Sequence, residues 1–385
     1  MSDEKPEARA YGNACPYVTG VSPARFPPNV TGDMLTLVPT APETMRRVIV
    51  SAEHSANVHE VPVPSINPGE ALVETVAVGV CGSDTHALHG RHPFIHLPYA
   101  PGHEVVGVVR RVADDVTSVQ PGQRVTVEPT LPCWSCKHCR AGRLNLCENL
   151  RFFGCVHDQG GMADYFTVPA NRLHVLPDAL DNRQALLIEP LSTPVHAVRL
   201  AGPLAGRTVA VLGAGTIGLL VLAAALADGA ARVVVTDVLV SKRQRALAMG
   251  AHAVVDAGRA DAVEAVREAL GESADVVFDC VAVQRTMDQA IDMALKGGTV
   301  VVVGVPSADV TVPLPLVQDQ QVRIQGSAMY LPEDYHRSIE LLLAGVVRHE
   351  DVITGVYPLE QVAEAFDASS SGEHVKVVVT AGEGV

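Results

Sequence analysis

A glycine-rich turn between a strand and a helix is the feature that most constrains the fold of this chain. Residues 209–212 are a short apolar run, residues 213–218 read Gly-Ala-Gly-Thr-Ile-Gly, and an apolar segment of helical length continues to residue 227. The form G-x-G-x-x-G alone is weak evidence, but the next strand candidate, 232–237, ends in the acidic residue Asp237. Strand, glycine turn, helix and acidic strand end together predict a βαβ unit that binds a dinucleotide.

Later segments continue the alternation of strand and helix. Residues 274–279 and 298–303 are further strand candidates, and helical stretches separate them. This alternation predicts a Rossmann-type domain, a doubly wound parallel sheet with helices on both faces. In such a domain the glycines bring the pyrophosphate of the cofactor to the positive end of the helix.

The acidic strand end predicts which nicotinamide cofactor is used. Asp237 would accept hydrogen bonds from both hydroxyls of the adenosine ribose and would repel a 2′-phosphate. We therefore expect NAD rather than NADP, although the cations Lys242 and Arg243 follow closely. The predicted cofactor-binding residues are Gly213, Gly215, Ile217, Gly218, Asp237 and Lys242.

The chain before this domain follows a different pattern. Between residues 48 and 187, short β-branched stretches such as 71–80, 105–112 and 123–128 are split by glycine and proline, which indicates a β-barrel region. A length of 385 residues with 48% hydrophobic side chains also exceeds one compact domain and predicts two cores.

Charge and composition narrow the class of partner. The net charge of −14 argues against nucleic acid and anionic membranes, because both favour a basic surface. No apolar run approaches the roughly 20 residues of a membrane span. The N-terminus lacks the basic and then apolar order of a secretory signal, so we expect a cytoplasmic protein that acts on a small molecule.

Four of the eight cysteines form a compact motif, C-x2-C-x2-C-x7-C. Four thiolates on one short loop can close a tetrahedral shell around zinc, and a closed shell predicts a structural site. Disulfides, a reactive thiol or an iron–sulfur cluster are the alternatives, and the expected compartment disfavours disulfides. The predicted ligands of this zinc are Cys133, Cys136, Cys139 and Cys147.

Two further segments carry a family resemblance. Residues 81–86 read Cys-Gly-Ser-Asp-Thr-His, and residues 102–107 read Gly-His-Glu-Val-Val-Gly. Together with the cysteine motif and the glycine turn, in this order, they resemble the zinc-dependent medium-chain alcohol dehydrogenases from about residue 45 to the C-terminus. The resemblance implies that Cys81 and His103 bind a catalytic zinc, which makes two zinc ions per chain. An open coordination position would let the zinc polarise an alcohol oxygen.

The third ligand separates branches of that family. Where liver-type enzymes carry a second cysteine, this chain has Glu189 in Leu-Ile-Glu-Pro-Leu-Ser, which resembles the sorbitol, or polyol, dehydrogenase branch. The resemblance implies that Glu104 can reach the metal and that Glu189 binds it directly or through water. With Cys81 and Glu104 ionised and His103 neutral, the loaded shell is already net neutral. We therefore expect Glu189 to be an exchanging ligand.

The same resemblance assigns the proton path. Ser83 would take the alcohol proton and pass it through the nicotinamide ribose to His86, and zinc-bound water is the alternative base. Asp84 would orient His103 as a carboxylate behind the ligand. The predicted catalytic residues are thus Ser83, His86 and Glu189.

The resemblance also has a departure near the substrate. Sorbitol dehydrogenases carry an Arg-Tyr pair where this chain has Met329 and Tyr330. The loss of the arginine leaves open a less polar alcohol, a cyclic polyol or an amino alcohol. We expect oxidation of a secondary alcohol to a ketone with NAD. The alternatives are a threonine-type amino-alcohol dehydrogenase and a non-catalytic NAD-binding protein.

The resulting domain organisation is also an expectation. A proline-rich extension with seven prolines covers residues 1–44. The resemblance implies a GroES-like catalytic barrel at 45–190, with the structural zinc lobe at about 131–149, then a Rossmann domain at 191–329 and a return to the catalytic domain at 330–385. It also implies a homo-oligomer, either a dimer or a tetramer.

Overall fold

The computed structural model describes residues 42–382. The predicted extension therefore lies outside the described residues except for its last three positions. Within the described chain, strands β1 (Thr44–Val50) and β2 (Ala56–Pro62) form a hairpin. Two larger sheets follow, one of six strands and one of seven.

The six-stranded sheet contains the glycine turn. All its neighbouring strands are parallel, in the order β12-β11-β10-β13-β14-β15. The order starts from β10 and runs outward in both directions, so the carboxyl edge of the sheet has a switch point beside β10, where doubly wound folds bind ligands. The strands are β10 (Thr208–Leu212), β11 (Arg232–Asp237), β12 (Ala253–Asp256), β13 (Ala274–Asp279), β14 (Ala294–Val302) and β15 (Arg323–Gly326).

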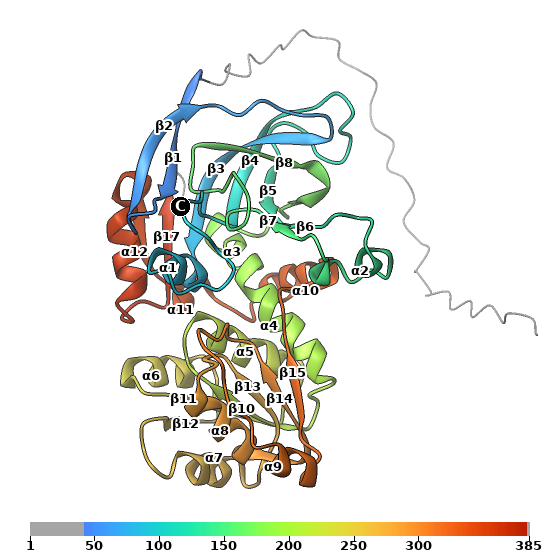
Figure 1. The fold of residues 1–385 in the computed structure, drawn as a ribbon, viewed down its shortest axis with the longest axis vertical. Helices are drawn as coiled ribbons and strands as arrows, with labels where there is room; N and C mark the ends of the chain where they lie inside the picture. The colour runs from blue at the N-terminus through green and yellow to red at the C-terminus, as the bar shows by residue number, and fades with distance from the viewer. Residues whose placement is uncertain (1–41, 383–385) are drawn as a thin grey trace, which may run out of the picture. The chain divides into compact units, whose positions relative to one another are not determined.

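Helices cover both faces of this sheet (Figure 1). Side chains alternate along β10, so Val209 and Val211 join a core with α5, while Ala210 and Leu212 join a second core with α7 and α8. A strand that is buried on both faces explains the continuous apolar run in the sequence. The helices are α5 (Thr216–Ala227), α6 (Val240–Ala248), α7 (Ala262–Leu270), α8 (Gln284–Met293) and α9 (Leu314–Asp319).

The seven-stranded sheet forms the other part of the fold. Its strand order is β16-β17-β3-β4-β5-β9, and β8 pairs with β3. Strand β17, close to the end of the described chain, pairs antiparallel with β3, so the C-terminal segment completes the sheet that the N-terminal half begins. The strands are β3 (Glu70–Val80), β4 (Glu104–Val112), β5 (Arg124–Val127), β8 (Tyr165–Pro169), β9 (Leu173–Val175), β16 (Ile353–Pro358) and β17 (Lys376–Thr380).

Helix α4 (Ile188–Ala201) joins the two sheets. One apolar core contains side chains from β3 and β4, from α4, from α5 and from α10 (Pro332–Leu343). The remaining short elements are α1 (Gly82–Leu88), β6 (Thr130–Leu131), α2 (Lys137–Arg140), β7 (Arg151–Phe152), α3 (Asn182–Ala185), α11 (His349–Val352) and α12 (Val362–Ser370).

The six-stranded parallel sheet with helices on both faces confirms the expected Rossmann-type domain, and the mostly antiparallel seven-stranded sheet agrees with the expected β-barrel region. Strand β15 (Arg323–Gly326) lies beyond the last strand candidate of the sequence analysis and adds an edge strand to the parallel sheet. No helix among the described residues is long and apolar enough to cross a membrane.

Candidate active site and zinc sites

Three side chains that could hold a metal ion meet where β3 and β4 lie side by side. Cys81 directly follows β3, and His103 and Glu104 stand at the start of β4. The strands are antiparallel, with Gly79 opposite Glu104. Ligand atoms of Cys81, His103 and Glu104 lie within 4.8 Å of one another. A Cβ at Gly79 would lie 1.8 Å from Oε2 of Glu104, so the carboxylate occupies space that only glycine leaves free.

A lysine that the sequence analysis left out holds Glu104. Nζ of Lys376, on β17, lies 2.6 Å from Oε1 and 2.8 Å from Oε2 of Glu104, and it also donates to the carbonyl of Val80 at 3.2 Å. Both side chains are buried, with 5% and 1% exposed. Burial works against the charge of Lys376, but the Glu104 carboxylate raises its pKa overall. The carboxylate of Glu104 is therefore part of a buried ion pair.

Glu189 lies in the first turn of α4, outside this group of three. The hydroxyl of Tyr330 donates to Oε1 of Glu189 at 2.6 Å, and both side chains are buried. Burial, together with the nearby charge of Glu104, raises the pKa of Glu189 to about 7. The carboxyl group is thus able to exchange a proton near neutral pH.

The four cysteines of the lobe also come together. Their sulfurs lie within 4.8 Å of one another, and zinc–sulfur bonds of about 2.3 Å in a tetrahedron need sulfurs about 3.8 Å apart. The backbone N–H of Cys133 donates to the sulfur of Cys147 at 3.2 Å, and that of Cys139 donates to Cys136 at 3.4 Å. Such donors stabilise thiolates. The lobe fits a structural zinc, and no disulfide forms among the described cysteines.

The glycine turn is shaped for a close approach of backbone to ligand. Gly213 has a φ of +93°, and a Cβ at Gly218 would lie 1.7 Å from the carbonyl oxygen of Gly213. Gly215 caps the N-terminus of α5, and Ile217 packs partly against the core beneath it. The turn therefore offers a helix N-terminus to a pyrophosphate.

Asp237 stands beside this turn at the end of β11. Its carboxylate accepts hydrogen bonds from the backbone N–H groups of Ala214 and Leu239, both at 2.8 Å. The guanidinium of Arg243 is held by the carbonyls of Asp237 and Val238 and by Asp256 at 3.4 Å. Arg243 is therefore engaged by backbone and carboxylate. The partly buried Lys242 is the neighbouring cation on the same helix.

Comparison with known proteins identifies the family. Residues 67–178 match the model of the alcohol dehydrogenase GroES-like domain, and residues 216–344 match that of the zinc-binding dehydrogenases. The chain is 34% identical to sorbitol dehydrogenase of Ovis aries over 337 residues, which cover 86% of this chain and 95% of the relative. The chain belongs to the zinc-binding alcohol dehydrogenase family.

Other relatives agree with this assignment. D-xylulose reductase A of Aspergillus niger is 32% identical over 86% of the chain and 95% of the relative. The structure of 2R,3R-butanediol dehydrogenase from Bacillus subtilis is similar with a TM-score of 0.81 at 28% identity, covering 88% of this chain and all of that one. A protein of Sinorhizobium meliloti described as a zinc-binding dehydrogenase and bound to NADP reaches 0.83 at 34% identity, over 88% of this chain and all of that one.

The family assignment confirms the expected enzyme class. The protein is an alcohol dehydrogenase whose cofactors are zinc and a nicotinamide dinucleotide. Thiol, imidazole and carboxylate donors gathered in a buried site fit zinc, and the glycine turn fits the dinucleotide.

The ring of the dehydrogenase's His103 has two buried neighbours, because ligand atoms of Asp84, His103 and Cys155 lie within 4.8 Å of one another. Asp84 accepts hydrogen bonds from the N–H of Cys81 and the hydroxyl of Tyr99, both at 3.0 Å. Nδ1 of His103 lies 3.3 Å from the sulfur of the buried Cys155. A cysteine from the loop after β7 thus stands beside the imidazole together with the expected carboxylate.

The two residues of the proposed proton path lie on α1 of the dehydrogenase. The hydroxyl of Ser83 is buried and has no hydrogen-bond partner in the described part of the chain. An unpaired buried hydroxyl is costly, which suits a group that a bound alcohol would complete. His86 is exposed one turn later, and its partial burial, together with electrostatic interactions with Arg91 and His89, lowers its pKa. A second unpaired buried hydroxyl, Ser327, follows β15.

Proposed function

We propose that this dehydrogenase oxidises a secondary hydroxyl of a polyol to a ketone and passes the hydride to NAD. The observation that carries the proposal is the buried Glu189–Tyr330 pair beside the Cys81, His103 and Glu104 group, because it places a carboxyl and a phenol where a second hydroxyl could be bound. The names of the relatives, sorbitol dehydrogenase and D-xylulose reductase, support a polyol.

Each side chain of the site has a separate role in the proposed reaction. Cys81, His103 and a glutamate would hold the catalytic zinc, which when bound supplies Lewis acidity to the alcohol oxygen, while NAD accepts the hydride. Ser83 takes the hydroxyl proton, and His86 releases it to solvent. Glu189, with Tyr330 donating to it, orients the substrate hydroxyl and excludes water.

A screen of polyols and simple secondary alcohols tests the proposed substrate. Absorbance of NADH should rise with polyols, and the efficiency should exceed that for a secondary alcohol without neighbouring hydroxyls. Met329, which is partly buried and has a φ of +53°, stands where sorbitol dehydrogenases carry an arginine. Efficient oxidation of the simple alcohols alone would replace the polyol proposal with a less polar substrate.

We expect two zinc ions per chain. The four-cysteine lobe offers a closed set of four ligands, whereas the Cys81 group offers three and would leave one coordination position open to a chelator. Brief chelation should therefore remove one zinc and abolish turnover, while the melting temperature stays close to that of the loaded protein. Elemental analysis after gel filtration checks the count, and active protein with one zinc or none contradicts it.

We expect NAD to be preferred over NADP. Asp237 stands at the end of β11, and Arg243 is already engaged by Asp256 and the backbone. Asp237→Ser should reduce the preference by at least tenfold, because the ribose hydrogen bonds and the repulsion of a 2′-phosphate are lost together. Ratios of kcat/KM for the two cofactors measure this. Equal use of both by the native enzyme would indicate that Lys242 offsets the carboxylate.

We also propose a cytoplasmic homo-oligomer. The edge strand β15 has a neighbour on one side only among the described strands, and an open edge can pair with a second copy. Free thiols in the zinc lobe suit a reducing compartment. Light scattering on the purified enzyme gives the mass, and a monomer would contradict the oligomer.

A further inference from the structure

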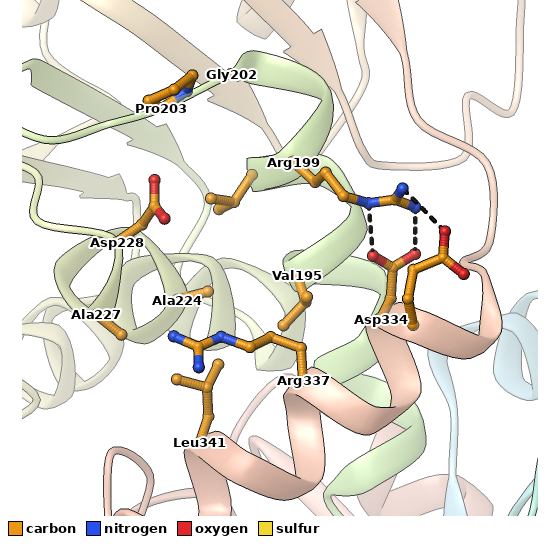
Figure 2. A pocket seen from close by; sticks show the side chains of 12 residues that line it. Val195, Arg199, Gly202, Pro203, Ala224, Ala227, Asp228, Asp334, Arg337 and Leu341 are labelled. Carbon is orange, nitrogen blue, oxygen red and sulfur yellow. Dashed lines mark hydrogen bonds and ion pairs between the residues drawn. The ribbon is translucent and has the colours of Figure 1, made fainter. Parts of the chain in front are cut away.

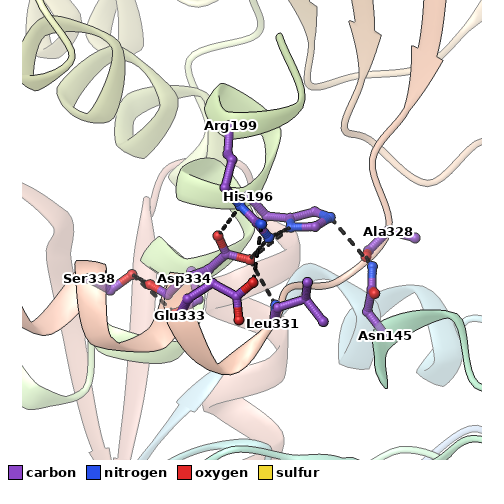
Figure 3. Close-up of polar contacts among 9 residues, drawn as sticks. Asn145, His196, Arg199, Ala328, Leu331, Glu333, Asp334 and Ser338 are labelled. Atoms are coloured by element: carbon purple, nitrogen blue, oxygen red, sulfur yellow. Dashed lines mark hydrogen bonds and ion pairs between the residues drawn. The ribbon is translucent and has the colours of Figure 1, made fainter. Parts of the chain in front are cut away.

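A buried asparagine of the cysteine lobe contacts the segment that carries Tyr330. Asn145 stands two residues before Cys147, and it is only 6% exposed although the next residue, Leu146, is exposed. Its Nδ2 donates to the carbonyl oxygen of Ala328 at 3.0 Å and lies 3.4 Å from Nε2 of His196 (Figure 3). The lobe is thus connected to the chain two residues before Tyr330 and to helix α4.

His196 is the histidine at the centre of these contacts. Its Nδ1 lies 2.8 Å from Oδ2 of Asp334 and 3.0 Å from Nη2 of Arg199. Its Nε2 lies 3.4 Å from Nδ2 of Asn145. The same N–H₂ group of Asn145 donates to the carbonyl of Ala328, so one amide contacts two different segments.

The same hydrogen-bond network reaches the two segments that carry Glu189 and Tyr330. Asp334 accepts hydrogen bonds from the N–H of Leu331 and from Arg199, all at 2.8 Å. His196 and Glu189 lie seven residues apart on α4, which places them on one face of the helix. Tyr330, between Ala328 and Leu331, donates to Glu189. Asn145 therefore connects both partners of the Glu189–Tyr330 hydrogen bond.

Helices α4 and α10 share an apolar core, and their polar contacts lie at its margin. A pocket of about 400 Å³ lies between α4, α5 and α10, lined by Val195 and Leu341 among others (Figure 2). Arg199 and Asp334 also line this pocket. The polar network around Asn145 therefore adds to the apolar packing that aligns α4 with α10.

We propose that Asn145 is a positioning residue, through which the cysteine lobe sets the geometry of the Glu189–Tyr330 pair. The inference deepens the proposed function and rests on a role for Glu189 in turnover. The zinc of the lobe then has a second effect besides local stability, because ordering the loop around it places Asn145.

The first test compares Asn145→Ala with Asn149→Ala, an exposed asparagine of the same segment. We expect Asn145→Ala to keep two zinc ions and to lower kcat about tenfold, with KM changed less than threefold, because positioning acts on the transition state. Asn149→Ala should match the native enzyme. Unchanged kcat in Asn145→Ala, with native turnover present, would overturn the inference and leave the proposed function intact.

A double-mutant cycle separates positioning from general destabilisation. If Asn145 acts through Tyr330, then Asn145→Ala should lower kcat less than twofold in a Tyr330→Phe background. If Asn145→Ala lowers kcat by the same factor in the Tyr330→Phe background as in the native enzyme, Asn145 does not act through this tyrosine. If the alanine variant does not fold, Asn145→Asp keeps the volume but loses both N–H donors, so the same results are expected.

Hydrogen exchange provides a readout that is independent of turnover. The amides of Leu331 and Tyr335 are hydrogen bonded in the native segment. They should exchange about tenfold faster in Asn145→Ala than in Asn149→Ala, while the amides of β3 and β4 stay unchanged. Equal protection from exchange in the two variants would contradict the positioning role of Asn145, whatever substrate the enzyme uses.

Discussion

Glu189→Gln should lower turnover about 10²- to 10³-fold while both zinc ions remain bound, whereas Cys81→Ser should remove the catalytic zinc and all measurable activity. A glutamine has the size of the glutamate and can still accept the hydrogen bond from Tyr330, so the fold around α4 should persist. It lacks the ionisable carboxyl group with which Glu189 would orient the substrate hydroxyl. Replacing the thiolate of Cys81 removes a ligand itself.

Lys376 adds a positive charge beside the group that would bind the catalytic zinc. Without it, zinc, Cys81 and Glu104 sum to zero, and an ionised Glu189 would make the site anionic. With Lys376 paired to Glu104, the same group carries one positive charge, which an ionised Glu189 brings to neutrality. Charge alone therefore does not keep Glu189 from the metal, and its place outside the group of three now supports the exchanging role.

Zinc content and turnover of the two variants, measured on the same preparations, decide between the roles of Glu189. Tyr330→Phe is the matched control, because it removes the donor to Glu189 but leaves the carboxyl group, and it should lose less activity than Glu189→Gln. If Glu189→Gln empties the catalytic site as completely as Cys81→Ser, Glu189 is a permanent ligand and Glu104 serves behind it.

Local motifs made much of the fold and the site predictable. The strand at 232–237 is visible as a continuous apolar run, because β10 and β11 are buried on both faces. The helix at 217–227 is visible as a longer apolar run after the glycine turn. Cys81 and His103 were found because each stands in a short signature at a strand end. The four cysteines share one loop, so spacing alone describes their geometry.

Contacts between distant segments were not predictable in this way. Lys376 reaches Glu104 across 272 positions and Tyr330 reaches Glu189 across 141, because the chain returns to the first sheet only at its end. Cys155 was overlooked since a lone cysteine usually acts as a small apolar residue. Lys376 did leave a signal, as a single cation before the buried strand Val-Val-Val.

Lys376→Met should lower the free energy of unfolding by about 3–5 kcal/mol, because it leaves the carboxylate of Glu104 buried without its partner. Urea unfolding followed by fluorescence measures the loss. Lys296→Met, at an exposed lysine, is the matched control and should change stability by less than about 0.5 kcal/mol. Equal unfolding midpoints for the two variants would show that the ion pair does not stabilise the fold.

The double variant Glu104→Gln/Lys376→Met should regain most of this stability, since the unpaired charge is then gone. Comparing Lys376→Met with and without zinc assigns Glu104 further. If Glu104 is a direct ligand, the metal replaces the lysine as its partner, and the destabilisation should shrink in the zinc-loaded protein. If Glu104 does not bind the metal directly, Lys376→Met should lose a similar amount of stability with and without zinc, because only Lys376 neutralises the charge of Glu104.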